Sequence, residues 1–597
     1  GPSVNILRTP LGGRNFEYMG EDPCLTATMA AEYIRGVQQN GVAACIKHFA
    51  LNNQEMYRES TNVEVSKRAL HEIYLPAFRA AVQQAGVWTV MGAYNKYLGE
   101  HCTQNNVLIN HILKGEWRFD GAVVTDWGAA HDTDQAARNG LDIEMGTWTN
   151  GLSFGASAAY DGYYLAHPFL EKIRNGQLSE SLLDEKVRRV LRLNFRTNMN
   201  RNRPYGSMRT EEHEDVAHFV AAEGIVLLKN NHRFFPIVPK RYAKIAVIGE
   251  NAVKRLSEGG GSSELKARRE ISPLEALTHH YGQDVINFSL GYASGKSDYN
   301  GEYPSGLDAD SLMQVAVELA KNADAVLFFG GLNKNFAQDT EGGDRQRMEL
   351  PYRQDELIRR LLAVNPNLGL VITSGNPVSM PWIDKVDGIV QSWYLGSQAG
   401  TAISDVISGK INPSGKLPFS IPMKLEESAA HHFGPESYPG VDGNQRYLED
   451  VLVGYRWHDT KHIKPLFAFG HGLSYTSFIY GKPVADQSTY VSGDTVRLRI
   501  PVKNTGQMYG ATALQVYVTQ QTPSVRRPEK ELKAFRKIGL HPGHEEEVEI
   551  SIPVNSFSFY SEAIESWKLE EDTFVLHIAS ASDNIHASIE IQIKNAG

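Results

Sequence analysis

The sequence V-V-T-D-W-G-A-A (residues 123–130) joins an apolar run, typical of a buried strand, to a carboxylate, an indole and a glycine. In an α/β barrel, residues at the carboxyl ends of the strands face the pocket in which the chemistry takes place. Asp126 is therefore a candidate catalytic residue. The alternative is an aspartate that caps the next helix, because strand-to-helix turns often place one there.

Two further apolar runs end in polar or aromatic groups. The run V-A-A-C-I-K-H-F-A (residues 42–50) ends near Lys47 and His48, and the run V-W-T-V-M-G-A-Y-N-K-Y (residues 87–97) presents Met91 and Tyr94. Each of these side chains alone is compatible with an ordinary, partly buried position. Three such strand ends together predict a pocket that holds a hydroxylated ligand.

Five motifs in a fixed order relate the chain to a known family. They are G-R-N-F-E-Y-M-G-E-D-P (residues 13–23), K-H-F-A-L-N-N-Q-E (47–55), V-V-T-D-W-G (123–128), N-P-S-G-K-L-P-F-S (412–420) and F-G-H-G-L-S-Y-T-S-F (469–478). In this order they resemble glycoside hydrolase family 3, and in particular its β-glucosidase branch. The resemblance implies an exo-acting enzyme that releases a terminal β-linked glucose with retention of configuration. By position, Asp126 matches the nucleophile of that family.

A retaining hydrolase needs a second carboxyl group roughly 5–5.5 Å from the first. The resemblance places this acid/base on D-T-E-G-G-D-R (residues 339–345), at Glu341, in a loop after an expected strand at 325–329. The alternative is a solvated surface loop in which Glu341 has no role. The mechanism predicts a lowered pKa for Asp126, which must be ionised to attack, and a pKa near the working pH for Glu341.

The remaining site residues are expected to bind the sugar. Arg14, Lys47, His48 and Tyr94 match family positions around the first subsite, and Arg58 is a further member of this set. Charged donors can make paired hydrogen bonds to neighbouring hydroxyls. Met91 and Trp127 supply apolar walls. Ser262, in E-G-G-G-S-S-E (residues 258–264), approaches from the second domain, although this stretch also reads as a flexible loop.

Three functions are alternatives to that of a β-glucosidase. The N-acetylglucosaminidase branch shares the Lys-His pair, but P-G-H-G and the D-S-H segment that follow it there are absent here. A β-xylosidase is a closer alternative, but its members usually have a cysteine after the nucleophile, and Trp127 at that position here resembles the glucosidase pattern. A non-catalytic carbohydrate-binding protein remains the alternative if the barrel is truly truncated.

The chain is expected to form a multidomain α/β protein. The alternation of apolar runs with helical patterns predicts two α/β units, and the short alternating strands that follow predict a β-sandwich. The resemblance implies that residues 1–200 form a (β/α)8 TIM-like barrel that lacks its N-terminal strands, followed by a linker (201–212), an α/β sandwich (213–422), a connector (423–481) and a fibronectin type III-like β-sandwich (482–597). The second unit would supply the acid/base loop. Homodimerisation is one role open to the last domain.

Family members have a substantial segment before G-P-S-V-N-I, which includes the first barrel strands. This segment is absent from the chain. We therefore expect that an N-terminal segment of the same protein is omitted here or is bound as a separate piece, and we prefer this to a true truncation. The reason is that a barrel without its first strands exposes unpaired strand edges.

The composition excludes several classes of protein. A net charge of −9 and a sequence pI near 6.2 argue against nucleic-acid binding. No apolar run reaches the length of about 18 residues that a membrane span needs. Cys24, Cys45 and Cys102 lack metal-ligand spacing and are expected to be thiols, and neither a nucleotide-binding motif nor another cofactor motif is present. The sequence does not fix the cellular compartment, and the resemblance suggests export to the periplasm or the medium.

Overall fold

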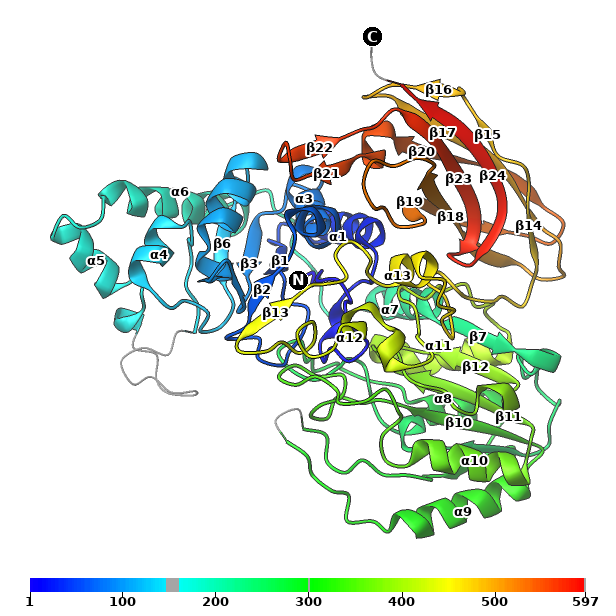
Figure 1. Ribbon diagram of the computed structural model, residues 1–597. Helices are drawn as coiled ribbons and strands as arrows, with labels where there is room; N and C mark the ends of the chain where they lie inside the picture. Colours follow the sequence, from blue (N-terminus) through cyan, green and yellow to red (C-terminus); the bar gives the residue numbers. More distant parts are fainter. Residues whose placement is uncertain (147–159, 299–300, 595–597) are drawn as a thin grey trace.

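The chain folds into three lobes that follow one another in sequence, with a connecting segment between the second and third (Figure 1). The computed structural model describes residues 1–146, 160–298 and 301–594. The first lobe ends with α6, the second extends from α7 to α11, and the third contains β14 to β24.

The first lobe is built on a parallel sheet in the order β1-β3-β6. Its strands are β1 (Cys45–Phe49), β3 (Thr89–Gly92) and β6 (Ala122–Thr125). Parallel bridges add one segment at each edge, from Ser3 to Lys47 and from Val124 to Ile143. The described residues therefore contribute five parallel segments side by side.

Helices separate these strands, as parallel connections require. They are α1 (Pro23–Gln38), α2 (Lys67–Ala69), a π-helix (Leu70–Tyr74), α3 (Pro76–Gln83), a second π-helix (Val107–Glu116), α4 (Thr133–Arg138), α5 (His167–Arg174) and α6 (Glu180–Arg196). The helical stretch over 67–83 is interrupted at Leu75, which separates the π-helix from α3. The helix changes geometry before Pro76, because proline has no N–H for the helical ladder and restricts the residue before it.

The second lobe contains a six-stranded sheet in the order β7-β12-β11-β10-β8-β9, in which only β7 is antiparallel to its neighbour. The strands are β7 (Val226–Asn230), β8 (Ile245–Ile248), β9 (Ile286–Ser289), β10 (Ala325–Gly331), β11 (Leu368–Thr373) and β12 (Gly388–Gln391). Strand β12 ends at Gln391, and Trp393 just beyond it has a positive φ and donates its indole N–H to the Gly224 carbonyl.

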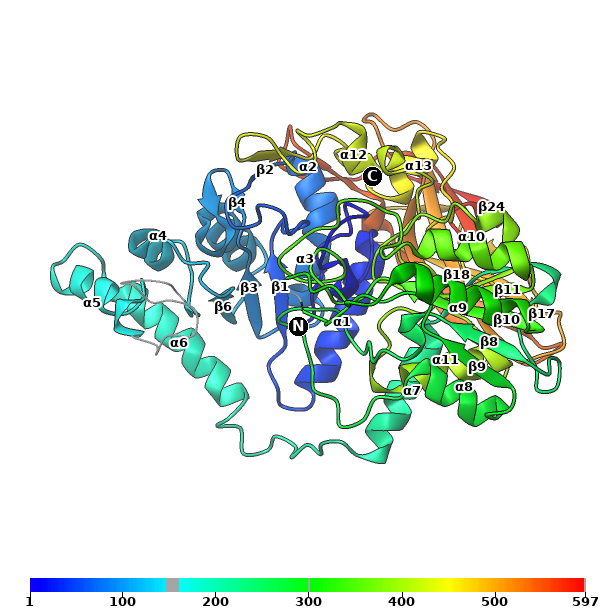
Figure 2. The same cartoon turned by 90° about the horizontal axis from the view of Figure 1, so that it is seen from below.

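Helices cover both faces of this sheet. They are α7 (Glu211–Gly224), α8 (Pro273–Tyr281), α9 (Ala309–Lys321), α10 (Gln354–Val364) and α11 (Ala399–Ser408). Along β10, Val326 and Phe328 belong to the same buried cluster as residues of α9 and α10, whereas Leu327 and Phe329 cluster with residues of α7, α8 and α11. Burial on both faces explains why the strands of this sheet read as unbroken apolar runs. Figure 2 shows the segment that leads from α6 of the first lobe to α7.

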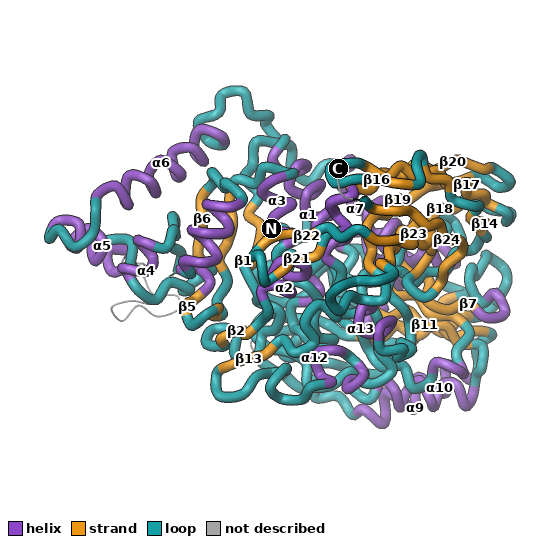
Figure 3. The backbone as a smooth tube through the Cα atoms, turned by 45° about the horizontal axis from the view of Figure 1, so that its top comes forward, coloured by secondary structure: helices purple, strands orange, loops and turns teal. Residues whose placement is uncertain are grey.

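The third lobe is a β-sandwich, and strands dominate it in Figure 3. One sheet pairs β17 with β14, β15 and β20, and the other has the order β16-β24-β23-β18-β19. The strands are β14 (Phe478–Tyr480), β15 (Val484–Ala485), β16 (Thr489–Tyr490), β17 (Thr495–Asn504), β18 (Gly510–Gln520), β19 (Glu531–Leu540), β20 (Glu545–Pro553), β23 (Asp572–Ala581) and β24 (Asn584–Ile593), with a separate hairpin of β21 (Phe559–Ser561) and β22 (Ser566–Lys568). Alternate residues of β17 enter the core, as the two-residue period predicts.

The connecting segment returns to the first lobe before the sandwich begins. It contains α12 (Ala429–His432), β13 (Asn444–Arg446) and α13 (Tyr455–Thr460). Strand β13 pairs with β2 (Asn62–Glu64) in a small sheet completed by β4 (Lys96–Tyr97) and β5 (Glu100–His101). The connecting segment thus packs against the first lobe as well as joining the other two.

The cysteines and the helices of the described residues have two further features. Cys24, Cys45 and Cys102 are all free thiols, and only Cys102 is fully buried. Over residues 1–146, 160–298 and 301–594, no helix combines the length and the apolar character needed to cross a bilayer.

Asp22 links the first lobe to the connecting segment through a fully buried carboxylate. It caps α1 by accepting the Leu25 N–H at 2.9 Å, accepts the Tyr455 hydroxyl at 2.9 Å and pairs with Arg456 at 2.7 Å. Substituting Asp22→Ala leaves a buried guanidinium without its partner, so we expect a loss of about 3–5 kcal/mol in the free energy of unfolding. Denaturant-induced unfolding measures this change.

Asp308→Ala is the matched control. Asp308 caps α9 by accepting the Ser311 N–H at 2.8 Å, but it is exposed. Only a cap is lost, so the destabilisation should be clearly smaller. Equal effects of the two substitutions would show that the buried pair with Arg456 adds nothing to stability.

Candidate active site

The carboxyl ends of β1, β3 and β6 bring five of the predicted residues to one edge of the sheet. Lys47 and His48 lie near the end of β1, Met91 lies in β3 with Tyr94 just after it, and Asp126 follows β6. The register pairs Phe49 with Gly92 and Gly92 with Thr125, so the three ends are level. The sheet thus collects these side chains around one point.

Asp126 is nearly buried, with 8% of its surface exposed. Its Oδ1 accepts the Trp127 N–H at 2.8 Å, and its Oδ2 lies 3.4 Å from His48 Nε2 without a hydrogen-bond donor among the described residues. Burial raises the pKa of Asp126, and the opposing effects of Arg14, the Trp127 N–H and Arg58 only partly offset it. The expectation of a lowered pKa is therefore wrong, because desolvation outweighs the nearby positive charge.

His48 is 1% exposed, and neither ring nitrogen has a hydrogen-bond partner within the described part of the chain. Burial, followed by the charges of Arg14, Lys47 and Arg58, lowers the pKa of His48 well below its ordinary value. The ring is therefore neutral at physiological pH. A neutral imidazole offers one donor and one acceptor, which suits a sugar hydroxyl.

Glu341 reaches the site on a loop that follows β10 in the second lobe. A parallel bridge joins Thr340 to Gly260, and the Glu341 N–H donates to the Gly260 carbonyl at 2.9 Å. Gly261 has a φ of +117°, and a Cβ there would lie 2.4 Å from the Glu341 Cβ. The glycine-rich stretch is thus an ordered support for Glu341, not a free loop, and it needs glycine for close approach.

The Glu341 carboxylate is held by donors from both lobes. Its Oε1 lies 3.0 Å from Arg58 Nη1 and 3.5 Å from Arg14 Nη1, and its Oε2 accepts the Ser262 N–H at 2.8 Å. Burial raises the pKa of Glu341, but Arg14, Arg58 and Ser262 outweigh burial and lower it to about 2. The expectation of a pKa near the working pH is wrong for this arrangement, because two guanidiniums stabilise the ionised form.

Arg14 and Lys47 share a carboxylate that the sequence analysis did not single out. Glu17 Oε1 accepts from Arg14 Nε at 2.5 Å, and Glu17 Oε2 lies 3.4 Å from Lys47 Nζ and accepts the Ser3 hydroxyl at 2.7 Å. Arg14 is 2% exposed. Glu17 therefore fixes two predicted sugar-binding cations relative to each other.

Aromatic groups complete the surroundings. The Arg58 guanidinium lies 4.7 Å from the centre of the Tyr94 ring, and the Tyr94 hydroxyl donates to the Trp127 carbonyl at 2.9 Å. Trp127 keeps 53% of its surface exposed, and Met91 is half-buried. Ser262 is exposed and reaches Glu341 through its backbone N–H.

Sequence reasoning missed Glu17, Glu55 and Asp344. Glu17 and Glu55 lie inside motifs that carry the resemblance, and Asp344 lies in the loop that the resemblance assigns to the acid/base, yet nothing in these stretches separates a structural carboxylate from a solvated one. Glu55 and Asp344 are buried at 5% and 4% exposure. Burial and backbone contacts, which only the fold supplies, distinguish them.

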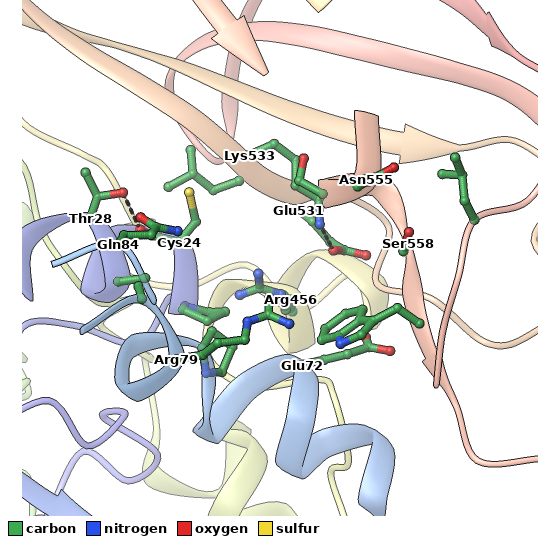
Figure 4. Close-up of a pocket in the computed structure, with 18 of the residues that line it drawn as sticks. Cys24, Thr28, Glu72, Arg79, Gln84, Arg456, Glu531, Lys533, Asn555 and Ser558 are labelled. Carbon is green, nitrogen blue, oxygen red and sulfur yellow. Dashed lines mark hydrogen bonds and ion pairs between the residues drawn. The ribbon is translucent and has the colours of Figure 1, made fainter. Parts of the chain in front are cut away.

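A cavity of about 660 Å³ lies elsewhere, between α1 and α3 of the first lobe and the sandwich (Figure 4). Arg79, Arg456 and Glu531 are among its lining residues, and none of the predicted site residues lines it. The chemistry of the strand ends therefore concerns a different part of the molecule.

The arrangement around Asp126 has the groups that cleavage of an acetal needs. One carboxylate comes from a strand end and another from a loop of a different lobe, and the same two arginines influence the ionisation of both. Neutral and cationic donors surround them. A nucleophile and a proton donor of this kind serve carbohydrate hydrolysis.

Comparison with known proteins agrees with this chemistry. The glycosyl hydrolase family 3 N terminal domain matches residues 1–193, the C-terminal domain of the same family matches 225–475, and a fibronectin type III-like domain matches 512–582. These matches show a multidomain α/β layout with a C-terminal β-sandwich.

Individual relatives extend over almost the whole chain. A β-glucosidase of Bacteroides ovatus is 51% identical over 99% of this chain and 80% of its own length, and thermostable β-glucosidase B of Acetivibrio thermocellus is 39% identical over 100% and 75%. The crystal structure of a Bifidobacterium adolescentis family 3 β-glucosidase superposes with a TM-score of 0.88 at 35% identity, covering 99% of this chain and 82% of that one. The chain therefore belongs to glycosyl hydrolase family 3.

Proposed function

We propose that the protein is a retaining, exo-acting β-glucosidase that removes terminal non-reducing β-D-glucosyl residues from oligosaccharides or glucosides. The observation that supports the proposal is that Glu341 of the second lobe lies 3.0 Å from Arg58 and 3.5 Å from Arg14 of the first lobe. The first lobe also presents the Asp126 carboxylate at its strand ends, 3.4 Å from His48. The names of the relatives at 51% and 39% identity support glucose as the sugar and do not favour a β-xylosidase.

The reaction proceeds by double displacement. Asp126 Oδ2, which lacks a donor among the described residues, attacks the anomeric carbon while Glu341 protonates the departing oxygen. Water then attacks the glucosyl–Asp126 ester, and Glu341 takes the proton from that water. The first anomer released is β-glucose.

The other side chains orient the sugar. Arg14, Lys47 and His48 bind hydroxyls, Tyr94 and Arg58 shape the wall between the two carboxyls, and Met91 and Trp127 provide apolar contact. Hydroxyls that bind Arg14 and Arg58 compete with Glu341 for these guanidiniums. Substrate binding therefore raises the pKa of Glu341 and favours the protonated acid that the first step needs.

The type of barrel and the domain bounds complete the proposal. We infer that the five parallel segments of the first lobe belong to a TIM-like barrel, because their strands are parallel and alternate with helices. Residues 1–200 would form this domain, 201–212 the linker, 213–422 the α/β sandwich, 423–481 the connector and 482–597 the fibronectin type III-like domain.

Asp126→Asn tests the nucleophile. The amide cannot form the glucosyl ester, so we expect kcat on an aryl β-glucoside to fall by roughly 10⁴-fold or more while glucose still binds. Steady-state kinetics and glucose titration measure the two quantities, with aryl β-xyloside as the comparison substrate. Activity close to the wild type in this variant would exclude Asp126 as nucleophile, and a preference of the wild type for xyloside would exclude the glucosidase.

Glu341→Ala tests the acid/base. Loss of general acid–base catalysis lowers the rate by roughly 10²–10⁴-fold. Activated aryl leaving groups need little protonation, and azide can replace the general-base-assisted water, so azide should restore turnover of such substrates and yield β-glucosyl azide. Chromatography identifies this product. Failure of azide to change the rate or the product would assign the acid/base elsewhere.

The pH dependence follows from the charges around both carboxyls. Asp126 must be ionised, and burial raises its pKa, so activity is lost as the pH falls through a value above the ordinary range of an aspartate. Arg58 lowers the pKa of Asp126 and of Glu341. Arg58→Gln should therefore raise the pKa of both carboxyls and move both limbs of the kcat profile, which reports the enzyme–substrate complex in which Glu341 is protonated, to higher pH.

Arg360→Gln is the control, because this exposed arginine pairs only with Glu356 on α10 among the described residues. Its profile should match that of the wild type. Profiles of the Arg58 variant that stay in place or move to lower pH would contradict the assignment of charge at the site.

A further inference from the structure

One buried carboxylate receives hydrogen bonds from three separate segments of the chain. Asp344 Oδ1 accepts the N–H groups of Gly13 at 2.8 Å and Glu55 at 2.9 Å, and Oδ2 accepts the Met56 N–H at 3.0 Å and the Tyr438 hydroxyl at 3.0 Å. Asp344 itself is 4% exposed. A carboxylate accepts on both oxygens, whereas no uncharged side chain of this size can.

The segments joined in this way carry the charged groups of the site. Gly13 precedes Arg14, Met56 lies just before Arg58, and Asp344 closely follows Glu341 on the same loop. The two lobes are thus connected at the residues that neighbour the proposed catalytic and sugar-binding groups.

A second set of contacts joins the same two lobes, and here a carboxylate of the first lobe accepts from the backbone of the second. Glu55 Oε2 accepts the Gly342 N–H at 2.8 Å and pairs with Arg58 Nη1 at 2.6 Å. The Arg345 N–H donates to the Leu11 carbonyl at 2.9 Å. Side chains of each lobe therefore bind the backbone of the other, and on the loop these contacts lie just after Glu341.

We propose that Asp344 is a positioning residue that fixes the Glu341 carboxyl opposite Asp126 by tying its loop to the backbone beside Arg14 and Arg58. This inference rests on the proposed function of the site. Asp344 touches neither the sugar nor the reacting atoms, so its effect passes through Glu341.

A positioning role has a kinetic signature that general destabilisation lacks. A misplacement of about 1 Å in a catalytic group can cost roughly 10²-fold in rate. Protonation by Glu341 matters for a poor leaving group such as an alkoxide and little for dinitrophenolate. Displacement of Glu341 therefore slows the hydrolysis of alkyl β-glucosides selectively, whereas a smaller folded fraction slows both substrates equally.

Asp344→Asn tests the proposal at almost unchanged volume. The amide has a single acceptor oxygen, so its NH2 group faces two of the donors that the second oxygen accepted. We expect kcat/KM for methyl β-D-glucoside to fall roughly 100-fold, and kcat/KM for dinitrophenyl β-D-glucoside to fall less than about tenfold. A proportional loss on both substrates would overturn the proposal.

Asp355→Asn is the matched control. Asp355 lies in α10 of the same lobe and accepts the Trp382 indole N–H at 2.8 Å, at a distance in sequence from the loop that carries Glu341. It should leave the ratio of the two kcat/KM values unchanged, whatever its effect on thermal stability. A shift of the ratio as large as that in the Asp344 variant would also overturn the proposal.

If Asp344→Asn does not fold, Tyr438→Phe decides the question. It removes one donor to Asp344 Oδ2 and leaves the carboxylate in place. The ratio should move in the same direction by a few-fold, and an unchanged ratio would contradict the positioning role. Wild-type enzyme without turnover of either glucoside would instead refute the proposed function, which separates the two failures.

Discussion

The site depends on ion pairs that cross between two lobes. Arg14 and Arg58 belong to the first lobe, and their guanidiniums lie 3.5 Å and 3.0 Å from a carboxylate oxygen of Glu341 in the second. Both arginines also influence the ionisation of Asp126. A charge that acts on two carboxyls at once must be fixed in place, and the half-buried Glu17 and the buried Glu55 supply the fixing contacts.

The electrostatics of the site oppose the simple assignment of a low pKa to the nucleophile and a high pKa to the acid. Burial raises the pKa of Asp126, and two guanidiniums lower that of Glu341 to about 2. Catalysis needs the reverse order, because one group attacks as an anion and the other donates a proton. In the proposed mechanism, sugar hydroxyls that draw the guanidiniums away from Glu341 would provide this change and would link substrate binding to proton placement through the same two arginines.

Local patterns in the sequence predicted much of the fold, and contacts between distant segments account for most of what was missed. The strand expected at 325–329 is β10 (Ala325–Gly331), because a strand buried on both faces has an unambiguous apolar pattern. The position of Asp126 directly after β6 was also predictable from the adjacent residues. Asp344 was not found, since its four donors come from segments far away in the chain. The ordered state of the stretch around Gly261 also depends on a partner, Glu341, that no local pattern reveals.

Covalent trapping tests the central claim most directly. The enzyme is treated with an activated fluoroglucoside, whose glucosyl ester hydrolyses slowly, and is then digested and analysed by mass spectrometry. The account predicts one added fluoroglucosyl group per chain, attached to Asp126. A label on another residue, or turnover of aryl β-glucoside without any covalent glucosyl enzyme and with release of α-glucose first, would contradict it.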